Sequence, residues 1–157
     1  MQYGASTPAA LVARAAAYGQ PALALTDRDG LYGAVRFVQA CTEAGIAPIL
    51  GVDLAVDLTG PHTGLQPGPQ SGQTSSRTPA KGGTLRDDRL PRVTILARGM
   101  NAGLAPGHGW AQLCRLVTDT HLSGQRGKPR TTTALIADAM RTHDGQPAPL
   151  VVLLGPD

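Results

Sequence analysis

Apolar positions recur along this chain with two periods, one typical of helices and one typical of strands. Spacings of three and four residues put apolar side chains on one face of a helix, whereas short continuous apolar runs are typical of buried strands. Thr7 and Pro8 open the first helix, because a hydroxyl caps the first turn and proline fits its first position. The pattern predicts helices over residues 8–18, 31–44, 109–121 and 132–142, and strands over 22–26, 47–56, 92–97 and 150–155.

Two of the predicted helices have a clear apolar stripe. Its members are Ala34, Val35, Val38 and Cys41 in the second helix, and Trp110, Leu113, Cys114 and Val117 in the third. The alternation of helix and strand with short connections favours a parallel sheet wrapped by helices. Since only about four strands follow in this order, we expect an α/β fold with an open, incomplete sheet.

Residues 59–90 interrupt this alternation. From Thr59 to Thr84, 10 of 26 residues are Gly or Pro, and most of the others are Thr, Ser or Gln. Such a composition cannot bury an apolar face. We therefore expect one partial domain over residues 1–157 that carries a disordered low-complexity insertion at 59–90.

Composition and charge narrow the class of protein. One Trp, three Tyr and one Phe argue against a base-stacking surface, and a formal net charge of +3 permits a nucleic-acid partner without indicating one. Two cysteines exclude a disulfide scaffold and a four-cysteine zinc site. No apolar run is long enough to span a membrane, and no signal peptide is evident. We expect a cytoplasmic protein with no membrane partner.

Two aspartates fall at strand positions where α/β folds bind ligands. Asp27 follows the first predicted strand, at the carboxyl end where ligands of parallel sheets sit. Asp53 lies within the second strand, on the same side as Ile49 and Gly51. A carboxylate inside a strand covered on both faces needs a partner or a metal. Asp27 and Asp53 together indicate two oxygen ligands for a hard divalent cation.

Plainer roles stay open for the same residues. Asp27 could cap the helix that follows it, and Asp29 fits that cap even better. Asp53 could be solvated, because it lies toward the end of its strand. Arg28 and Asp29 follow Asp27 directly and are expected at the same end of the sheet, either as phosphate-binding or as structural residues.

The histidines and the remaining motifs give no complete site. His62 and His108 lie in segments where we expect solvated side chains, and His121 and His143 lie at predicted helix ends, where a protonated ring favours the helix dipole. The chain has no paired zinc-ligand motif, Walker A loop or G-x-S-x-G elbow. The basic loop 126–130 is typical of a solvated segment, with a phosphate contact as the alternative.

Three segments carry a resemblance to a known family: Tyr-Gly-Ala-Ser at 3–6, Ala-Leu-Thr-Asp-Arg-Asp-Gly-Leu-Tyr-Gly-Ala-Val-Arg-Phe at 24–37, and Pro-Ile-Leu-Gly-Val-Asp-Leu at 48–54. They closely resemble the polymerase-and-histidinol-phosphatase (PHP) domain, and more narrowly the N-terminus of the bacterial DNA polymerase III alpha subunit and its error-prone relatives. Segments 93–97, 109–117 and 150–155 follow in the order of that family. The arginine at position 28 resembles actinobacterial versions.

The resemblance implies a distorted (βα)7 barrel with up to three divalent metals, zinc, manganese or magnesium, at its strand ends. In active members these metals support phosphoester hydrolysis, including 3′–5′ exonuclease activity in some polymerases. By position, Asp27 matches the aspartate of the family's second motif, and Asp53 matches a ligand that is usually Glu. Arg28 stands where that motif has His, and a guanidinium cannot ligate a metal. The family's His-X-His strand, later barrel strands and polymerase palm are not in this sequence, so the implied metal site is incomplete and holds no catalytic residue.

We therefore expect a partial PHP domain of a DNA polymerase III alpha-type enzyme, a DNA-directed DNA polymerase of replication or error-prone repair synthesis that uses magnesium elsewhere. The segment is expected to be structural in that parent protein, where it contacts the rest of the polymerase chain, and to meet DNA and replication subunits through the parent. Alone, it is expected to have no polymerase activity. The alternatives are a stand-alone metal-dependent phosphoesterase, with Asp27 and Asp53 as ligands and Arg28 as phosphate clamp, and an inert remnant that acts as an interaction module.

Overall fold

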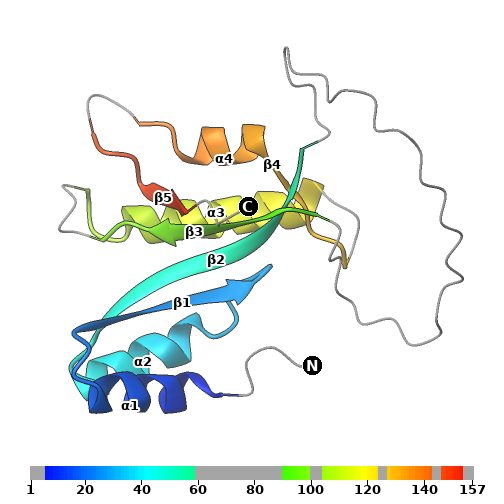
Figure 1. Cartoon of the computed structure of the whole chain (residues 1–157). Helices are drawn as coiled ribbons and strands as arrows, with labels where there is room; N and C mark the ends of the chain where they lie inside the picture. The colour runs from blue at the N-terminus through cyan, green and yellow to red at the C-terminus, as the bar shows by residue number, and fades with distance from the viewer. Residues whose placement is uncertain (1–5, 59–89, 100–103, 124–126, 143–145, 154–157) are drawn as a thin grey trace, which may run out of the picture.

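The computed structural model describes residues 6–58, 90–99, 104–123, 127–142 and 146–153. The described residues form four helices and a sheet. Figure 1 shows that the sheet is curved. In chain order the elements are α1 (Pro8–Ala17), β1 (Ala22–Arg28), α2 (Ala34–Ala44), β2 (Ala47–Asp57), β3 (Arg92–Ala97), α3 (His108–Ser123), β4 (Thr131–Thr132), α4 (Thr133–Ala139) and β5 (Leu150–Leu153). The predicted insertion falls almost wholly outside the described residues.

The first two helices begin and end for local reasons. The Thr7 hydroxyl accepts a hydrogen bond from the Ala10 N–H at 3.3 Å, so the predicted cap of α1 is confirmed. Gly45 ends α2 in the left-handed region, with φ of 69°, where a residue without a Cβ atom is favoured. The α2 helix starts only at Ala34, three residues later than predicted, because residues 29–33 form the turn that leaves β1.

The sheet is mixed rather than parallel. Its strands run in the order β1-β2-β3-β5, and β4 pairs with β2 off this path. β1 and β2 are parallel, but β3 is antiparallel to both β2 and β5. The prediction of about four parallel strands is therefore wrong for β3. A parallel return needs a crossover, usually a helix, and the segment between β2 and β3 has no helical pattern, so β3 pairs directly with β2 in the opposite direction.

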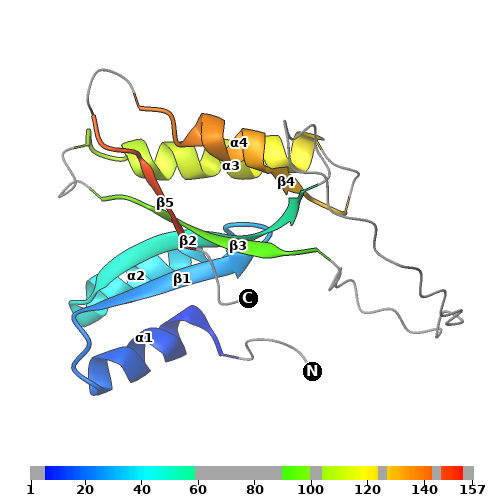
Figure 2. The ribbon, with the colours of Figure 1, turned by 45° about the horizontal axis from the view of Figure 1, so that its top comes forward.

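The helices pack on one face of the sheet. Leu50 of β2 packs with the cluster that α1 and α2 form, and Val52 and Leu54 of the same strand pack with α3. Alternate residues of a strand point to the same face, so α2 and α3 cover the same side. In Figure 2, α3 runs along β3 and β5 and α4 lies beside α3 next to β4, while α1 and α2 lie beside β1.

The buried stripes of the helices are partly those predicted. In α2, Ala34 and Cys41 are buried, but Val35 is 69% exposed and Phe37 is completely buried in its place. In α3, Leu113 is buried as predicted, Trp110 and Val117 pack half-buried against the same core, and Leu116 and Thr120 are fully buried as well.

The other face of the sheet has no covering helix in the described part of the chain. It carries Ile49 of β2 and Leu153 of β5, which are 37% and 45% exposed, and the polar residues Asp53 and Arg92 at one end. Figure 1 looks onto this face, with β3 passing in front of α3. The candidate site lies at its edge, where β1 and β2 end and β3 begins.

Candidate functional site at the carboxyl end of β1

Asp27, near the end of β1, caps the helix that follows. Its Oδ2 accepts a hydrogen bond from the Gly33 N–H at 2.6 Å, and Gly33 is the first flanking residue of α2. A Cβ atom on Gly33 would lie 3.0 Å from that oxygen and 3.0 Å from Leu25, so the close approach is suited to glycine. A carboxylate at a helix N-terminus is also favoured by the helix dipole. This hydrogen bond agrees with the capping role left open for Asp27, and its role as a metal ligand stays a prediction.

Asp29 occupies the turn in a left-handed backbone conformation, with φ of 54°. Its N–H donates to the Asp53 carbonyl at 2.9 Å, and its Oδ1 accepts from Arg92 Nη2 at 2.8 Å and from the Ala55 N–H at 3.4 Å. The prediction that Asp29 is the better helix cap is therefore wrong. The turn directs its carboxylate toward β2 and β3 instead of toward α2.

Asp53 is paired with an arginine on the neighbouring strand. Arg92 Nε donates to Asp53 Oδ2 at 2.8 Å, and Arg92 Nη2 donates to the Asp53 carbonyl at 2.6 Å. The Arg92 side chain is 18% exposed, and the carboxylates of Asp29 and Asp53 are 25% and 29% exposed. Asp53 thus has the partner that its strand position requires, and it is only partly solvated.

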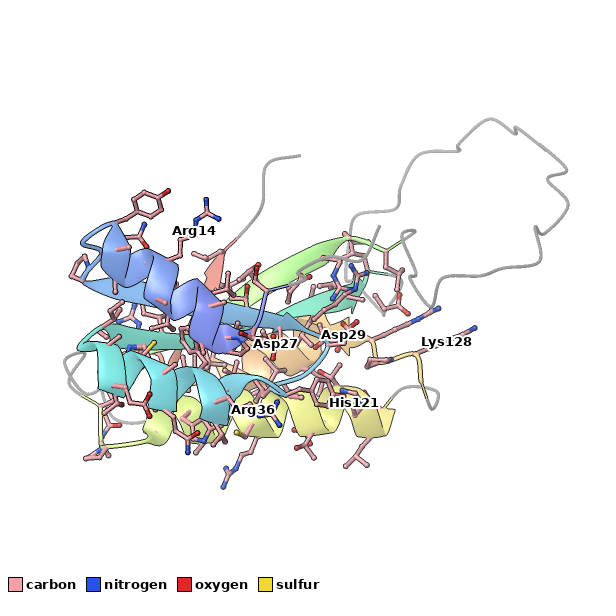
Figure 3. All side chains as sticks on the ribbon, turned by 90° about the horizontal axis from the view of Figure 1, so that it is seen from below. Arg14, Asp27, Asp29, Arg36, His121 and Lys128 are labelled. Atoms are coloured by element: carbon pink, nitrogen blue, oxygen red, sulfur yellow. The ribbon has the colours of Figure 1, made fainter. Side chains whose placement is uncertain are left out.

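The predicted ligands Asp27 and Asp53 line one open cavity of about 750 Å³, but they do not face each other across it. In the β1–β2 register Arg28 lies opposite Asp53, whereas Asp27 lies opposite Val52, on the helix-covered side. Figure 3 shows Asp27 beside the start of α2 and Asp29 near His121. Arg28 and Arg36 also line the cavity, so its rim is rich in guanidinium groups.

The described residues do not fit a metal centre of the kind the resemblance implies. Among them, no group of three or more His, Cys, Asp or Glu side chains could hold an ion. Asp27 is engaged by a backbone N–H and Asp53 by a guanidinium, and Arg28 adds a second cation nearby. A divalent cation would have to displace these donors and lie close to like charge.

The other predicted residues have structural contacts or lie outside the described ranges. The Nε2 of His121, in the last turn of α3, lies 2.7 Å from the Asp29 carbonyl oxygen. Lys128 and Arg130 line a small hollow of about 50 Å³ with Arg28 and Arg92, and Arg130 lies 4.0 Å from Asp57. His108 is at the start of α3 and half-buried. His62, His143 and Arg126 fall outside the described residues.

Sequence reasoning missed Arg92, which donates hydrogen bonds to both Asp29 and Asp53 at this site. A signal was present: Arg92 opens a strand whose residues Val93 and Ile95 are buried, so Arg92 and Thr94 must point to the opposite face. Asp53 also points to that face. A strand aspartate in need of a partner and a strand arginine on the same face form a natural pair, but only once the register of β2 and β3 is known.

Residues 1–146 match the PHP domain family. The chain belongs to this family. Similarity to curated relatives agrees: an error-prone DNA polymerase of Mycobacterium tuberculosis is 35% identical over 145 residues, 89% of this chain and 10% of that protein. An error-prone DNA polymerase of Symbiobacterium thermophilum is 40% identical over 146 residues, 92% of this chain and 10% of that protein. This PHP domain therefore spans about a tenth of the length of the relatives it matches, and it is homologous to their N-terminal region.

One solved structure is also similar to part of this chain. An amidohydrolase structure from Chromobacterium violaceum, with bound sulfate and no metal, is 21% identical and covers 76% of this chain and 30% of its own, with a TM-score of 0.42. A TM-score of that size does not establish a common architecture, so the family assignment rests on the sequence matches. In the described ranges, no helix of the PHP domain has the length and apolar character needed to cross a membrane.

Proposed function

We propose that this PHP domain is a structural, non-catalytic part of an error-prone-type DNA polymerase. One observation carries the proposal: Arg92 binds the carboxylates of Asp29 and Asp53, and Gly33 binds that of Asp27, so the acidic groups are engaged within the fold. A metal-dependent hydrolase needs such carboxylates free to hold an ion and a water. Here they hold the ends of three strands and the start of a helix together.

The uncovered face of the sheet supports a role inside a larger chain. Ile49 and Leu153 leave apolar surface at a position where a folded domain would bury it. The curated relatives are about ten times longer than this chain, and they supply the kind of further chain that could cover such a face. In this proposal the domain packs against the rest of the polymerase chain in the cytoplasm. It meets DNA and replication subunits only through that chain, whose magnesium chemistry lies elsewhere.

A metal-dependent phosphoesterase is the second candidate. The observation in its favour is the cavity of about 750 Å³ that Asp27, Asp53 and Arg28 line together. Membership of the PHP family implies that this site would bind a divalent metal, zinc, manganese or magnesium. In this alternative Asp27 and Asp53 would exchange their present partners for the ion, and Arg28 would bind the phosphate as a charged clamp.

The test is hydrolysis of bis(p-nitrophenyl) phosphate by the purified chain in the presence of Mg²⁺, Mn²⁺ or Zn²⁺. We expect no release of nitrophenol above that of a double variant, Asp27→Ala with Asp53→Ala, and no template-dependent incorporation of deoxynucleotides. Metal-dependent release that the double variant abolishes would establish the phosphoesterase and refute the structural role. Template-dependent incorporation by the same preparation would refute the assignment of the polymerase chemistry to another part of the parent.

A further inference from the structure

We infer that the guanidinium of Arg92 is the fixed cation of this domain, standing at the strand ends in place of a divalent metal. This inference rests on the proposed structural function and adds the residue that performs it. A metal at this edge of the sheet would tie carboxylates from neighbouring elements together. Arg92 does this with a covalently attached charge, so the domain needs no ion for its acidic residues.

The contacts of Arg92 reach three segments of the chain. From β3 its Nη2 donates to Asp29 in the turn after β1 at 2.8 Å, and to the carbonyl of Asp53 in β2 at 2.6 Å. Its Nε donates to the Asp53 carboxylate at 2.8 Å. Such charge-assisted bonds are about twice as strong as neutral ones, and the planar fork fixes their directions.

The charges at this point balance without an ion. Asp29 and Asp53 bring two negative charges, and Arg92 brings one positive charge. Arg28 supplies the second positive charge, because its Nε lies 3.7 Å from Asp29 Oδ2. A divalent cation added to this group would be repelled by two guanidinium groups in a partly buried site.

The direction of β3 places Arg92 where it can act in this way. Because β3 is antiparallel to β2, its first residue lies at the edge where β1 and β2 end, and Arg92 pairs in register with Ala55. In a parallel sheet the first residue of β3 would lie at the opposite edge. The sequence predicted neither the direction of β3 nor the partner of Asp53. The first explains the second, because only an antiparallel β3 places Arg92 beside Asp53.

The experiment is thermal unfolding of the full chain, followed by circular dichroism in EDTA and in Mg²⁺, Mn²⁺ or Zn²⁺. The variants are Arg92→Gln and Arg92→Lys, and the matched control is Arg98→Gln, an exposed arginine just beyond the same strand. We expect the same Tm for the unaltered chain in every solution. Arg92→Gln should lower Tm by about 5 °C or more, and Arg98→Gln should leave it unchanged.

Arg92→Lys keeps the charge but cannot form the forked contacts, so its Tm should lie between those of the unaltered chain and Arg92→Gln. If Arg92→Gln does not fold, the inference is tested by the Tm of Arg92→Lys and by the Tm of the unaltered chain in EDTA and in each metal. A Tm that rises with metal and falls with EDTA in the unaltered chain overturns the inference, and so does an Arg92→Lys or Arg92→Gln variant with the Tm of the control. The hydrolysis assay is independent of this readout: activity refutes the proposed function, whereas metal-dependent stability without activity refutes only the role of Arg92.

Discussion

Asp29 combines an unusual backbone conformation with several hydrogen bonds at this site. A left-handed backbone costs an ordinary L-residue roughly 1–2 kcal/mol, and short polar side chains tolerate it best. At φ of 54°, Asp29 turns the chain out of β1, donates its N–H to β2, accepts from Arg92 and offers its carbonyl to His121. Each contact is ordinary by itself. Their combination explains why the turn adopts this conformation without a glycine.

At the same scale, we expect both cysteines to react slowly with a thiol reagent in the folded chain. Burial raises the pKa of the Cys41 thiol and of the Cys114 thiol, which favours the unreactive neutral form. Cys41 is completely buried and Cys114 is half-buried, so Cys114 should react first. The measurement is reaction with 5,5′-dithiobis(2-nitrobenzoic acid) at about pH 8, near the usual pKa of a free thiol, with and without guanidinium chloride.

The same pKa shifts predict how stability changes with pH. Because the folded state holds the thiol protons more tightly, the stabilisation is complete below the unfolded pKa of cysteine and is lost as pH rises through the higher folded pKa. Tm should therefore fall in the alkaline range in the unaltered chain. A Cys41 that reacts in the folded chain as fast as in guanidinium chloride would contradict the burial on which this prediction depends.

Among the elements, two buried threonines should respond in opposite ways to the loss of a hydroxyl. Thr131 of β4 is completely buried, and its Oγ1 has no hydrogen-bond partner among the described residues. Thr120 of α3 is equally buried, but its Oγ1 donates to the Leu116 carbonyl at 2.7 Å. Thr131→Val should be neutral or stabilising by up to about 1 kcal/mol, because the change removes an unpaired polar group.

Thr120→Val is the matched control and should cost about 0.5–1.5 kcal/mol, the net value of the lost hydrogen bond. The free energies of unfolding of both variants can be measured by urea denaturation. If Thr131→Val destabilises the chain as much as Thr120→Val, the hydroxyl of Thr131 has a partner after all, and β4 is held differently from the arrangement described.

The elements also show what a sequence can and cannot reveal. The caps Thr7 and Gly45 act within one helix turn, so local chemistry predicted where α1 begins and where α2 ends. Apolar runs predicted the strands, but such a run has no direction, and β3 was assigned the wrong one. Arg92 and Asp29 are 63 residues apart, so their pairing depends on a register that no local pattern contains. The same holds for the choice of Asp27 over Asp29 as the cap, which the left-handed turn decides.

On the scale of the whole molecule, we expect most of the segment between β2 and β3 to be dispensable for folding. The Val56 N–H donates to the Pro91 carbonyl at 2.9 Å, so the ends of this segment are held side by side by the sheet. Replacing residues 60–88 by a short Gly/Ser turn should leave unfolding cooperative and increase stability by about 1–2 kcal/mol, because a shorter loop costs less entropy to close.

The control for this deletion is a Gly/Ser segment of the original length, which should leave the stability close to that of the unaltered chain. Thermal unfolding distinguishes the cases. Loss of the cooperative transition in the short variant, but not in the control of equal length, would show that the sheet needs the distance that the segment provides.

The contacts of Arg92 with Asp29 and Asp53 also affect how far the domain depends on the availability of a metal ion. The stability that a bound metal gives to a fold depends on the concentration of the free ion, and a chelator removes it. A guanidinium is made with the chain, stays charged at every physiological pH and cannot be withdrawn by a chelator. We therefore expect a domain held together by Arg92, Asp29 and Asp53 to keep the same stability whether or not a divalent metal is present.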